Sequence, residues 1–136
     1  MPQCRLFAID DALKTVVVDG LYTKHLYGQD VSVSVVKFVA ETGGSLPAKT
    51  HHHGEEASFQ IVGACEVIEG DGDPADPVTP MAAHDAILIP AGVRHYGTNS
   101  FGPEGVSIRL NIVSPPRTEF GPEDAAPYYP LKDRTA

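Results

Sequence analysis

The chain has 136 residues, of which 42% are hydrophobic and 21% are charged, so one folded domain with a buried core is expected and disorder is excluded. The formal net charge of −8, with no basic cluster to offset it, argues against nucleic acid or an anionic membrane as a partner. The N-terminus has no long apolar run, so we expect no membrane span. The two cysteines, Cys4 and Cys65, form no C-x-x-C pair, so we expect reduced thiols in a cytoplasmic protein.

Runs of β-branched and aromatic residues, separated by turn residues, predict strands in the first third of the chain. These runs are Lys14 to Val18, Leu21 to Tyr27 and Val31 to Val39. In the third run, valines at every second position alternate with serines, and this period of two places one face of the strand inward. No stretch shows convincing helical periodicity, and only Ala8 to Leu13 could form a short helical turn.

The rest of the chain shows the same pattern. Further strands are predicted at Ala57 to Val62, Ala64 to Glu69, Ala86 to Ile89 and Val106 to Val113. Between them, Gly70 to Pro80 (GDGDPADPVTP) is predicted to be a loop, and its acidic residues lack the spacing of a calcium-binding EF-hand. Several short strands at regular turn spacing predict an all-β sandwich or barrel rather than βαβ units.

The most informative segment is His84 to Asn99, which reads HDAILIPAGVRHYGTN. A short strand leads into a turn at Pro90, Ala91 and Gly92, and a second strand then presents His95. Pro90 fixes φ and Gly92 permits a positive φ, so the chain is expected to reverse sharply just before the histidine.

A second polar segment, Gly44 to Gly63, lies upstream and reads GSLPAKTHHHGEEASFQIVG. It contains three consecutive histidines followed by Glu56; the histidines are His51, His52 and His53. Residues i and i+2 of a strand point to the same side. One register therefore presents Thr50 and His52 together, and the other presents His51 and His53.

These two segments resemble the two conserved motifs of the cupin superfamily. The second motif has the form G-x5-P-x-G-x2-H-x3-N, and it is matched by Pro90, Gly92, His95 and Asn99, with His84 in place of the first glycine. The first motif has the form G-x5-H-x-H-x3,4-E-x6-G, and it is matched by Gly44, Glu56 and Gly63. The resemblance implies a small antiparallel β-barrel (a double-stranded β-helix, or jelly roll) with a metal ion inside, and commonly a dimer that shares strands.

The family spacing would place the two histidines of the first motif at positions 50 and 52, and position 50 is Thr50. The other register keeps two imidazoles, His51 and His53, but needs a shortened turn before Glu56 or a β-bulge. Gly54 suits such a local adjustment. We expect two of the three consecutive histidines to belong to the site, and the residues alone leave open which two.

The resemblance implies that the metal ligands are His95, Glu56 and two of the three consecutive histidines, with Glu56 also a candidate catalytic residue. Imidazoles with one carboxylate suit a divalent transition metal, namely Fe, Mn, Ni, Co, Cu or Zn, and the order of affinities does not select among them. Three or four protein ligands leave coordination positions for substrate, water or dioxygen.

Two residues are candidates for contacts with a small-molecule substrate. Gln60 shares a strand face with Glu56 by alternation, although that face could equally be a polar outer face. Arg109 lies in the middle of a predicted strand, where an unpaired charge is costly, so it either clamps an acidic substrate or forms a surface ion pair. His25 is expected to be structural on an edge strand.

We expect one cupin barrel at residues 1–114 and an extended proline-rich tail at 115–136, because proline removes the donors that a sheet interior needs. The tail is expected to pack on its own barrel or on a partner subunit, with Phe120, Tyr128 and Tyr129 as anchors. A homodimer is expected because exposed strand edges need cover.

The leading functional hypothesis is a metal-dependent enzyme that acts on a small oxygenated or acidic molecule, with dioxygenase-type oxidoreductase chemistry first and isomerase or lyase chemistry second. The alternative is a non-catalytic barrel that binds or senses a small ligand, and the missing histidine at Thr50 favours it. The fold alone does not choose between them, because one fold hosts many functions.

Overall fold

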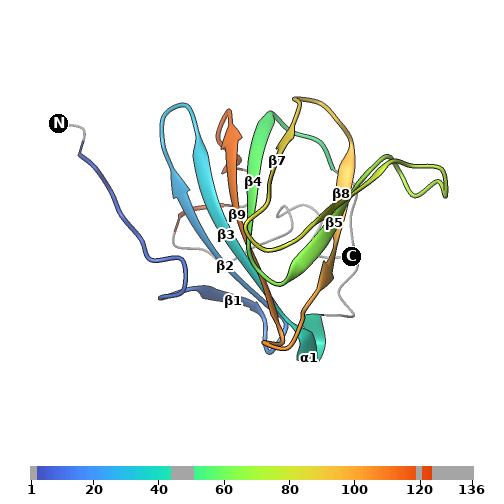
Figure 1. Cartoon of the computed structure of the whole chain (residues 1–136). Helices are drawn as coiled ribbons and strands as arrows, with labels where there is room; N and C mark the ends of the chain where they lie inside the picture. The colour runs from blue at the N-terminus through green and yellow to red at the C-terminus, as the bar shows by residue number, and fades with distance from the viewer. Residues whose placement is uncertain (1–2, 44–50, 119–120, 124–136) are drawn as a thin grey trace.

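The structure is a computed structural model that describes residues 3–43, 51–118 and 121–123. These residues form nine strands and one short helix (Figure 1). In chain order the elements are β1 (Lys14–Val17), β2 (Leu21–Tyr27), β3 (Ser32–Val39), α1 (Ala40–Gly43), β4 (Glu55–Val62), β5 (Ala64–Glu69), β6 (Val78–Met81), β7 (Ala86–Ile89), β8 (His95–Ser100) and β9 (Val106–Ser114). Within the described residues, no helix has the length and apolar character to cross a membrane.

The strands pair antiparallel and form two sheets. The larger sheet has the order β1-β2-β3-β9-β4-β7, and the smaller has the order β6-β5-β8. Figure 1 shows the two sheets facing each other and converging toward α1. The last strand, β9, lies between β3 and β4, so the chain returns to the middle of the sheet where it began. This arrangement confirms the predicted antiparallel all-β barrel.

Two local predictions differ from the structure. Val78–Met81 is a strand, whereas the sequence predicts a loop up to Pro80. This strand is the edge of the small sheet, where Pro80 pairs with Glu66. An edge strand has a neighbour on one side only, so it tolerates a proline, which has no backbone N–H to donate. Ala8 to Leu13 forms turns and bends, and the one helix of the described residues is instead α1.

The barrel interior is polar along β4 and β9. On β4 the buried side chains alternate with more exposed ones, and they are Glu56, Ser58 and Gln60. Asn111 and Arg109 of β9 lie opposite Ser58 and Gln60 in the register. The Ser58 hydroxyl donates to Asn111 Oδ1 across 2.6 Å. Buried polar groups of this kind require hydrogen-bond partners, and here the two neighbouring strands supply partners to each other.

Apolar side chains elsewhere form two core clusters, and the first of them joins the two sheets. One cluster joins β5, β6 and β7 and consists of Cys65, Val67, Met81 and Ile89. The other joins β2 and β3 and consists of Leu21, Val36 and Phe38. Burying one such side chain contributes about 1.5–3 kcal/mol. The scaffold is therefore built largely by residues other than the polar ones along β4 and β9.

Candidate metal centre

Three histidines from two distant segments of the chain converge: His51, His53 and His95. Each offers one ring nitrogen, and these nitrogens all lie within 4.8 Å of one another. The ring centroids of His51 and His95 are 4.4 Å apart, and those of His53 and His95 are 4.9 Å apart. Imidazole nitrogens gathered around one point are a donor set that a divalent transition metal could occupy.

Backbone carbonyls orient two of the three rings. His53 Nδ1 donates to the Gly54 carbonyl oxygen across 2.8 Å, and His95 Nδ1 donates to the Val93 carbonyl oxygen across 2.8 Å. A carbonyl oxygen only accepts, so each Nδ1 carries a proton. In a neutral ring this leaves the lone pair on Nε2, which is the tautomer that metal-binding histidines obtain in the same way.

Backbone pairing between the two segments sets the positions of these rings. His51 and His95 form an isolated antiparallel bridge, with N–H···O distances of 3.0 and 2.9 Å. Gly92 N donates to the His53 carbonyl oxygen across 2.8 Å. Gly92 has φ of 81°, which is the positive φ that the sequence predicts for this turn.

Gly54 brings the chain from the histidines into β4. A Cβ atom at this position would lie 2.0 Å from the Ser114 carbonyl oxygen and 2.5 Å from Pro115 Cδ, so only glycine fits. The close passage of Gly54 past the end of β9 leads directly to Glu56, whose carboxyl faces the histidines.

The structure has the register in which His51 and His53 share a side. His53 is nearly enclosed, since its side chain is 6% exposed, and His51 is partly buried. His52 is exposed and lies outside the histidine group. Thr50 falls outside the described residues.

Glu56 lies beside the histidine group in a buried position. Its Oε1 is 3.2 Å from His53 Nε2, and both side chains are less than a tenth exposed. Burial raises the pKa of the Glu56 carboxyl, but the hydrogen bond and charge of His53, together with the charges of His95 and Arg117, outweigh it and hold the pKa below its usual value. The carboxyl is therefore ionised at neutral pH.

Burial raises the pKa of a carboxyl such as Glu56, but it lowers the pKa of an imidazole such as His95. Its imidazole is 4% exposed, and desolvation lowers its pKa, with the hydrogen bond to Val93 and the charge of Glu56 opposing the shift. The ring is consequently neutral at neutral pH. A neutral ring is the form that can bind a metal.

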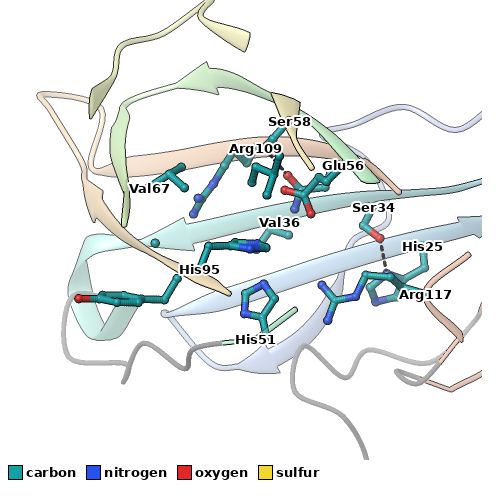
Figure 2. Close-up of a pocket in the computed structure, with 14 residues that line it drawn as sticks. His25, Ser34, Val36, His51, Glu56, Ser58, Val67, His95, Arg109 and Arg117 are labelled. Carbon is teal, nitrogen blue, oxygen red and sulfur yellow. Dashed lines mark hydrogen bonds between the residues drawn. The ribbon is translucent and has the colours of Figure 1, made fainter. Parts of the chain in front are cut away.

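The histidines open onto a pocket inside the barrel (Figure 2). His51, Glu56 and His95 contribute to its wall, and residues from β2, β3, β4, β5, β7, β8 and β9, together with Arg117, complete it. Arg109 reaches the pocket from β9, and its NH2 group donates to Asn99 Oδ1 across 3.0 Å. The asparagine of the second motif thus holds the pocket arginine in place.

Gln60 is fully buried but does not line the pocket. Its amide nitrogen donates to the Val62 carbonyl oxygen across 2.7 Å and to Ser107 Oγ across 3.0 Å. These contacts tie β4 to β9, so the side chain occupies the interior below the pocket rather than its wall.

Sequence reasoning assigned no pocket role to several residues that line the pocket, among them His25, Ser34 and Arg117. His25 is expected on an edge strand, but β2 lies between β1 and β3, and the ring is 5% exposed. His25 Nδ1 lies 2.9 Å from Ser34 Oγ. The alternation of side chains along β2 and β3 could have placed His25 and Ser34 on the inner face of the sheet. Arg117 follows the last strand, so no strand alternation predicts where its side chain lies.

Comparison with known proteins finds likeness in structure only. No family model and no curated protein matches the amino-acid sequence. KdgF from Halomonas sp. superimposes with a TM-score of 0.64 at 21% identity, covering 85% of this chain and 96% of that one. An RmlC-like cupin from Shewanella frigidimarina NCIMB 400 superimposes with a TM-score of 0.63 at 18% identity, covering 88% and 97%.

A further structural neighbour is an iron(II) protein, FeII HppE. It superimposes with a TM-score of 0.60 at 18% identity, and the match covers 81% of this chain but only 60% of HppE. Identities this low establish the fold and not the activity. Together with the two motifs and the antiparallel double sheet, these neighbours show that this chain has the RmlC-like cupin fold.

Proposed function

We propose that this protein is a metal-dependent cupin enzyme that acts on a small acidic or oxygenated molecule. The observation that carries the proposal is the contact between His53 and Glu56. Nδ1 of His53 donates to the Gly54 carbonyl oxygen, so Nε2 is the nitrogen that faces the ionised Glu56 carboxylate, 3.2 Å away. Two acceptors in a buried site repel each other unless a proton or a cation lies between them. A shared metal ion satisfies both groups at once.

The residues that would hold the metal are His51, His53 and His95, with the Glu56 carboxylate as the fourth ligand. These donors suit Fe, Mn, Ni, Co, Cu or Zn in the divalent state. When bound, such a metal supplies Lewis acidity and, if it is redox-active, a place for dioxygen. The chain's own residues then bind and orient the substrate in the adjoining pocket.

Arg109 is the substrate-binding residue of the pocket floor. Its guanidinium lines the pocket, and Asn99 fixes one of its nitrogens from behind. A guanidinium can bind a carboxylate or a phosphate through two parallel hydrogen bonds. Gln60 supports this wall from below through Ser107, and we assign it no contact with substrate.

Oxygen-dependent chemistry of the dioxygenase type is the first candidate reaction. A three-histidine group leaves coordination positions open, and a structural neighbour, FeII HppE, contains iron(II). Isomerase or lyase chemistry is the second candidate, because His25 lies in the pocket wall with Ser34 at Nδ1 and could transfer a proton. The case for a non-catalytic barrel weakens, because the three histidines converge without Thr50.

The direct test is reconstitution of the metal-free protein with each candidate metal, followed by oxygen consumption on a panel of catechols, flavonols, β-diketones and keto acids. The proposal expects one metal to confer turnover on at least one acidic or oxygenated compound. Isomerisation or cleavage without oxygen uptake would favour the second reaction class. Stoichiometric metal binding with no turnover in either assay would favour the ligand-binding alternative.

We also infer a homodimer, formed through the outer face of the large sheet. Residues opposite one another in antiparallel strands share a face, and this face carries the apolar side chains of Ala57, Phe59, Leu88, Leu110 and Ile112. Leu88 is 64% exposed and Phe59 is 36% exposed. An apolar face of this kind on a single chain is typical of a protein interface.

A cytoplasmic location belongs to the same proposal. The cysteines are unpaired, with Cys4 exposed and Cys65 buried in the core. An exposed thiol persists most readily in a reducing compartment. Fractionation of the source cells with an antibody to the chain would test the assignment.

A further inference from the structure

One face of β8 carries His95, Gly97 and Asn99 at every second position. Residues two apart on a strand face the same side, so these three positions share the inner face of the barrel. His95 belongs to the candidate metal centre, and Gly97 lines the pocket. Asn99 contacts the side chain of Arg109. This face of β8 therefore connects the metal centre with the residue to which substrate binding is assigned.

The side chain of Arg109 crosses the barrel from the large sheet to the small one. Arg109 belongs to β9, and its NH2 group donates to Asn99 Oδ1 of β8 across 3.0 Å. A Cβ atom at Gly97 would lie 2.9 Å from Arg109 NH1, so the missing side chain leaves the space that the guanidinium occupies. Figure 2 shows the side chain extending from β9 toward Val67, with Glu56 on the other side in this view. Two positions of β8 thus set where the guanidinium lies.

Asn99 is itself held by buried hydrogen bonds. Its Oδ1 also accepts from the Ser107 hydroxyl across 3.2 Å, and Ser107 Oγ accepts from Gln60 Nε2 across 3.0 Å. Gln60 is 0% exposed and Ser107 is 1% exposed. Arginine only donates hydrogen bonds, so the oxygen of the Asn99 amide, and not its nitrogen, must face Arg109. The network fixes an oxygen acceptor at this point of the pocket wall.

The group that holds Arg109 carries no charge. An amide oxygen accepts a hydrogen bond from a guanidinium without neutralising it. Within the part of the chain that the structure describes, Arg109 forms no ion pair with a carboxylate. A carboxylate in place of the Asn99 amide would form such a pair and cancel most of the charge that a ligand experiences. The positive charge of Arg109 is therefore held in position and stays available.

We propose that Asn99 is a positioning residue that determines the specificity of the pocket. It holds the Arg109 guanidinium with a neutral oxygen, so that the guanidinium can bind an anionic group of the substrate. This inference rests on the proposed function, which assigns substrate binding to Arg109. The amide at position 99 then decides whether the pocket prefers an anionic compound to a neutral compound of the same shape.

Malonate is a suitable probe because malonamide has nearly the same shape and no charge. Calorimetric titration of both compounds into metal-free and Zn(II)-loaded wild type should show tighter binding of malonate. Arg109→Gln should weaken malonate binding by about tenfold and leave malonamide unchanged, because hydrogen bonds to a charged group are the stronger ones. Any binding of malonate to the zinc ion is common to all variants, so the comparison between variants removes it.

Two substitutions of Asn99 separate charge from shape. Asn99→Asp keeps the shape and an oxygen acceptor but pairs with Arg109, so malonate affinity should fall by about tenfold, as in Arg109→Gln. Asn99→Ala removes the acceptor without adding a charge, and a fall of about threefold is expected. A merely structural role would give the opposite order, because aspartate preserves the shape of asparagine and alanine does not.

Ser100→Asp is the matched control for the added charge. Ser100 is the next residue of β8, it is exposed, and by alternation its side chain points to the other face of the strand. Malonate affinity within about twofold of wild type is expected, because a charge on the exposed face is screened by solvent. Melting temperatures of all variants would show that they are folded.

Each part of the proposal has its own contrary result. Equal affinity of wild type for malonate and malonamide, or an unchanged malonate affinity in Arg109→Gln, would overturn both the role of Arg109 and that of Asn99. A loss in Arg109→Gln without a loss in Asn99→Asp, or a larger loss in Asn99→Ala than in Asn99→Asp, would overturn the role of Asn99 alone.

Two further outcomes are distinguishable from these. If Asn99→Asp does not fold, Asn99→Ala decides, and wild-type malonate affinity in that variant would overturn the proposal. Failure of the proposed metal site would appear separately, as absence of zinc binding, while titrations of the metal-free protein still report on Asn99 and Arg109.

Discussion

The nitrogen Nε2 of His53 and the carboxylate of Glu56 lie 3.2 Å apart in a buried position, and this contact is the chemical centre of the proposed site. Nδ1 of His53 donates a hydrogen bond to the Gly54 carbonyl oxygen, so Nε2 is the nitrogen that faces Glu56. Side chains arranged in this way can share a proton or a metal ion.

The protonation of His95 and Glu56 makes the metal-free protein sensitive to acid. The pKa of His95 is lowered in the folded state, so the unfolded chain binds this proton first as pH falls below about 6.5. The pKa of Glu56 is also lowered, and its contribution is lost at lower pH, below about 4.5. Both shifts make the folded state more stable at neutral pH than at acid pH.

We therefore expect the free energy of unfolding to decrease from pH 7 to pH 5, by up to about 1.4 kcal/mol per pH unit for the one proton of His95. Denaturant unfolding at several pH values measures this slope. His95→Gln should flatten it in this window, while the loss below pH 4.5 should remain. A slope unchanged by His95→Gln would show that other groups cause the acid sensitivity.

The choice among the three consecutive histidines depended on contacts far away in the sequence. The alternation of a strand restricts the choice to His51 with His53 or to His52 with Thr50, and it goes no further. Gly54 passes within van der Waals contact of Ser114, and Gly92 pairs with His53. These two contacts set the register, and neither is visible in local sequence patterns.

At the scale of elements, the connection into β7 carries backbone strain at the one position that departs from the second motif. His84 has φ of 78°, in the left-handed region that glycine adopts without cost. Its N–H donates to the Gln60 carbonyl oxygen across 2.7 Å, so the conformation is held in place. The second motif has glycine at this position because the backbone here adopts a positive φ.

His84→Gly should stabilise the protein by about 1 kcal/mol, because it removes the strain of a side chain at positive φ. Thermal unfolding of metal-free protein provides the measurement. Gly92→Ala, at φ of 81° in the next turn, is the matched control and should destabilise by a similar amount. A loss of stability in His84→Gly would mean that the imidazole makes a compensating contact.

The bounds of β2, β5 and β7 match the prediction, because each of these short runs is set apart by turn residues in the sequence. The prediction failed at β6, because Pro80 is a loop signal that an edge strand tolerates. The sequence also could not show that β9 inserts between β3 and β4. That insertion brings Arg109 and Asn111 opposite Gln60 and Ser58 and so creates the polar interior.

At the scale of the whole molecule, the outer face of the large sheet predicts the assembly. Leu88→Glu, at the most exposed residue of the apolar face, should turn the dimer into a monomer because it places a charge in a dry interface. Light scattering at micromolar concentration measures the mass. Val78→Glu is the control, since Val78 is 50% exposed on the edge of the other sheet. A wild-type monomer, or equal loss of dimer in both variants, would contradict this interface.

The central claim is that the two sheets form a scaffold around one metal site made by His51, His53 and His95. The most direct measurement is the metal content of the purified, reconstituted protein and of single alanine variants. Wild type and His52→Ala should bind about one equivalent of metal per chain, because His52 is exposed and lies outside the group. His51→Ala, His53→Ala and His95→Ala should lose most of it while remaining folded, and Glu56→Ala should lose less. Full metal content in all four histidine variants, or no metal in the wild type, would contradict the account.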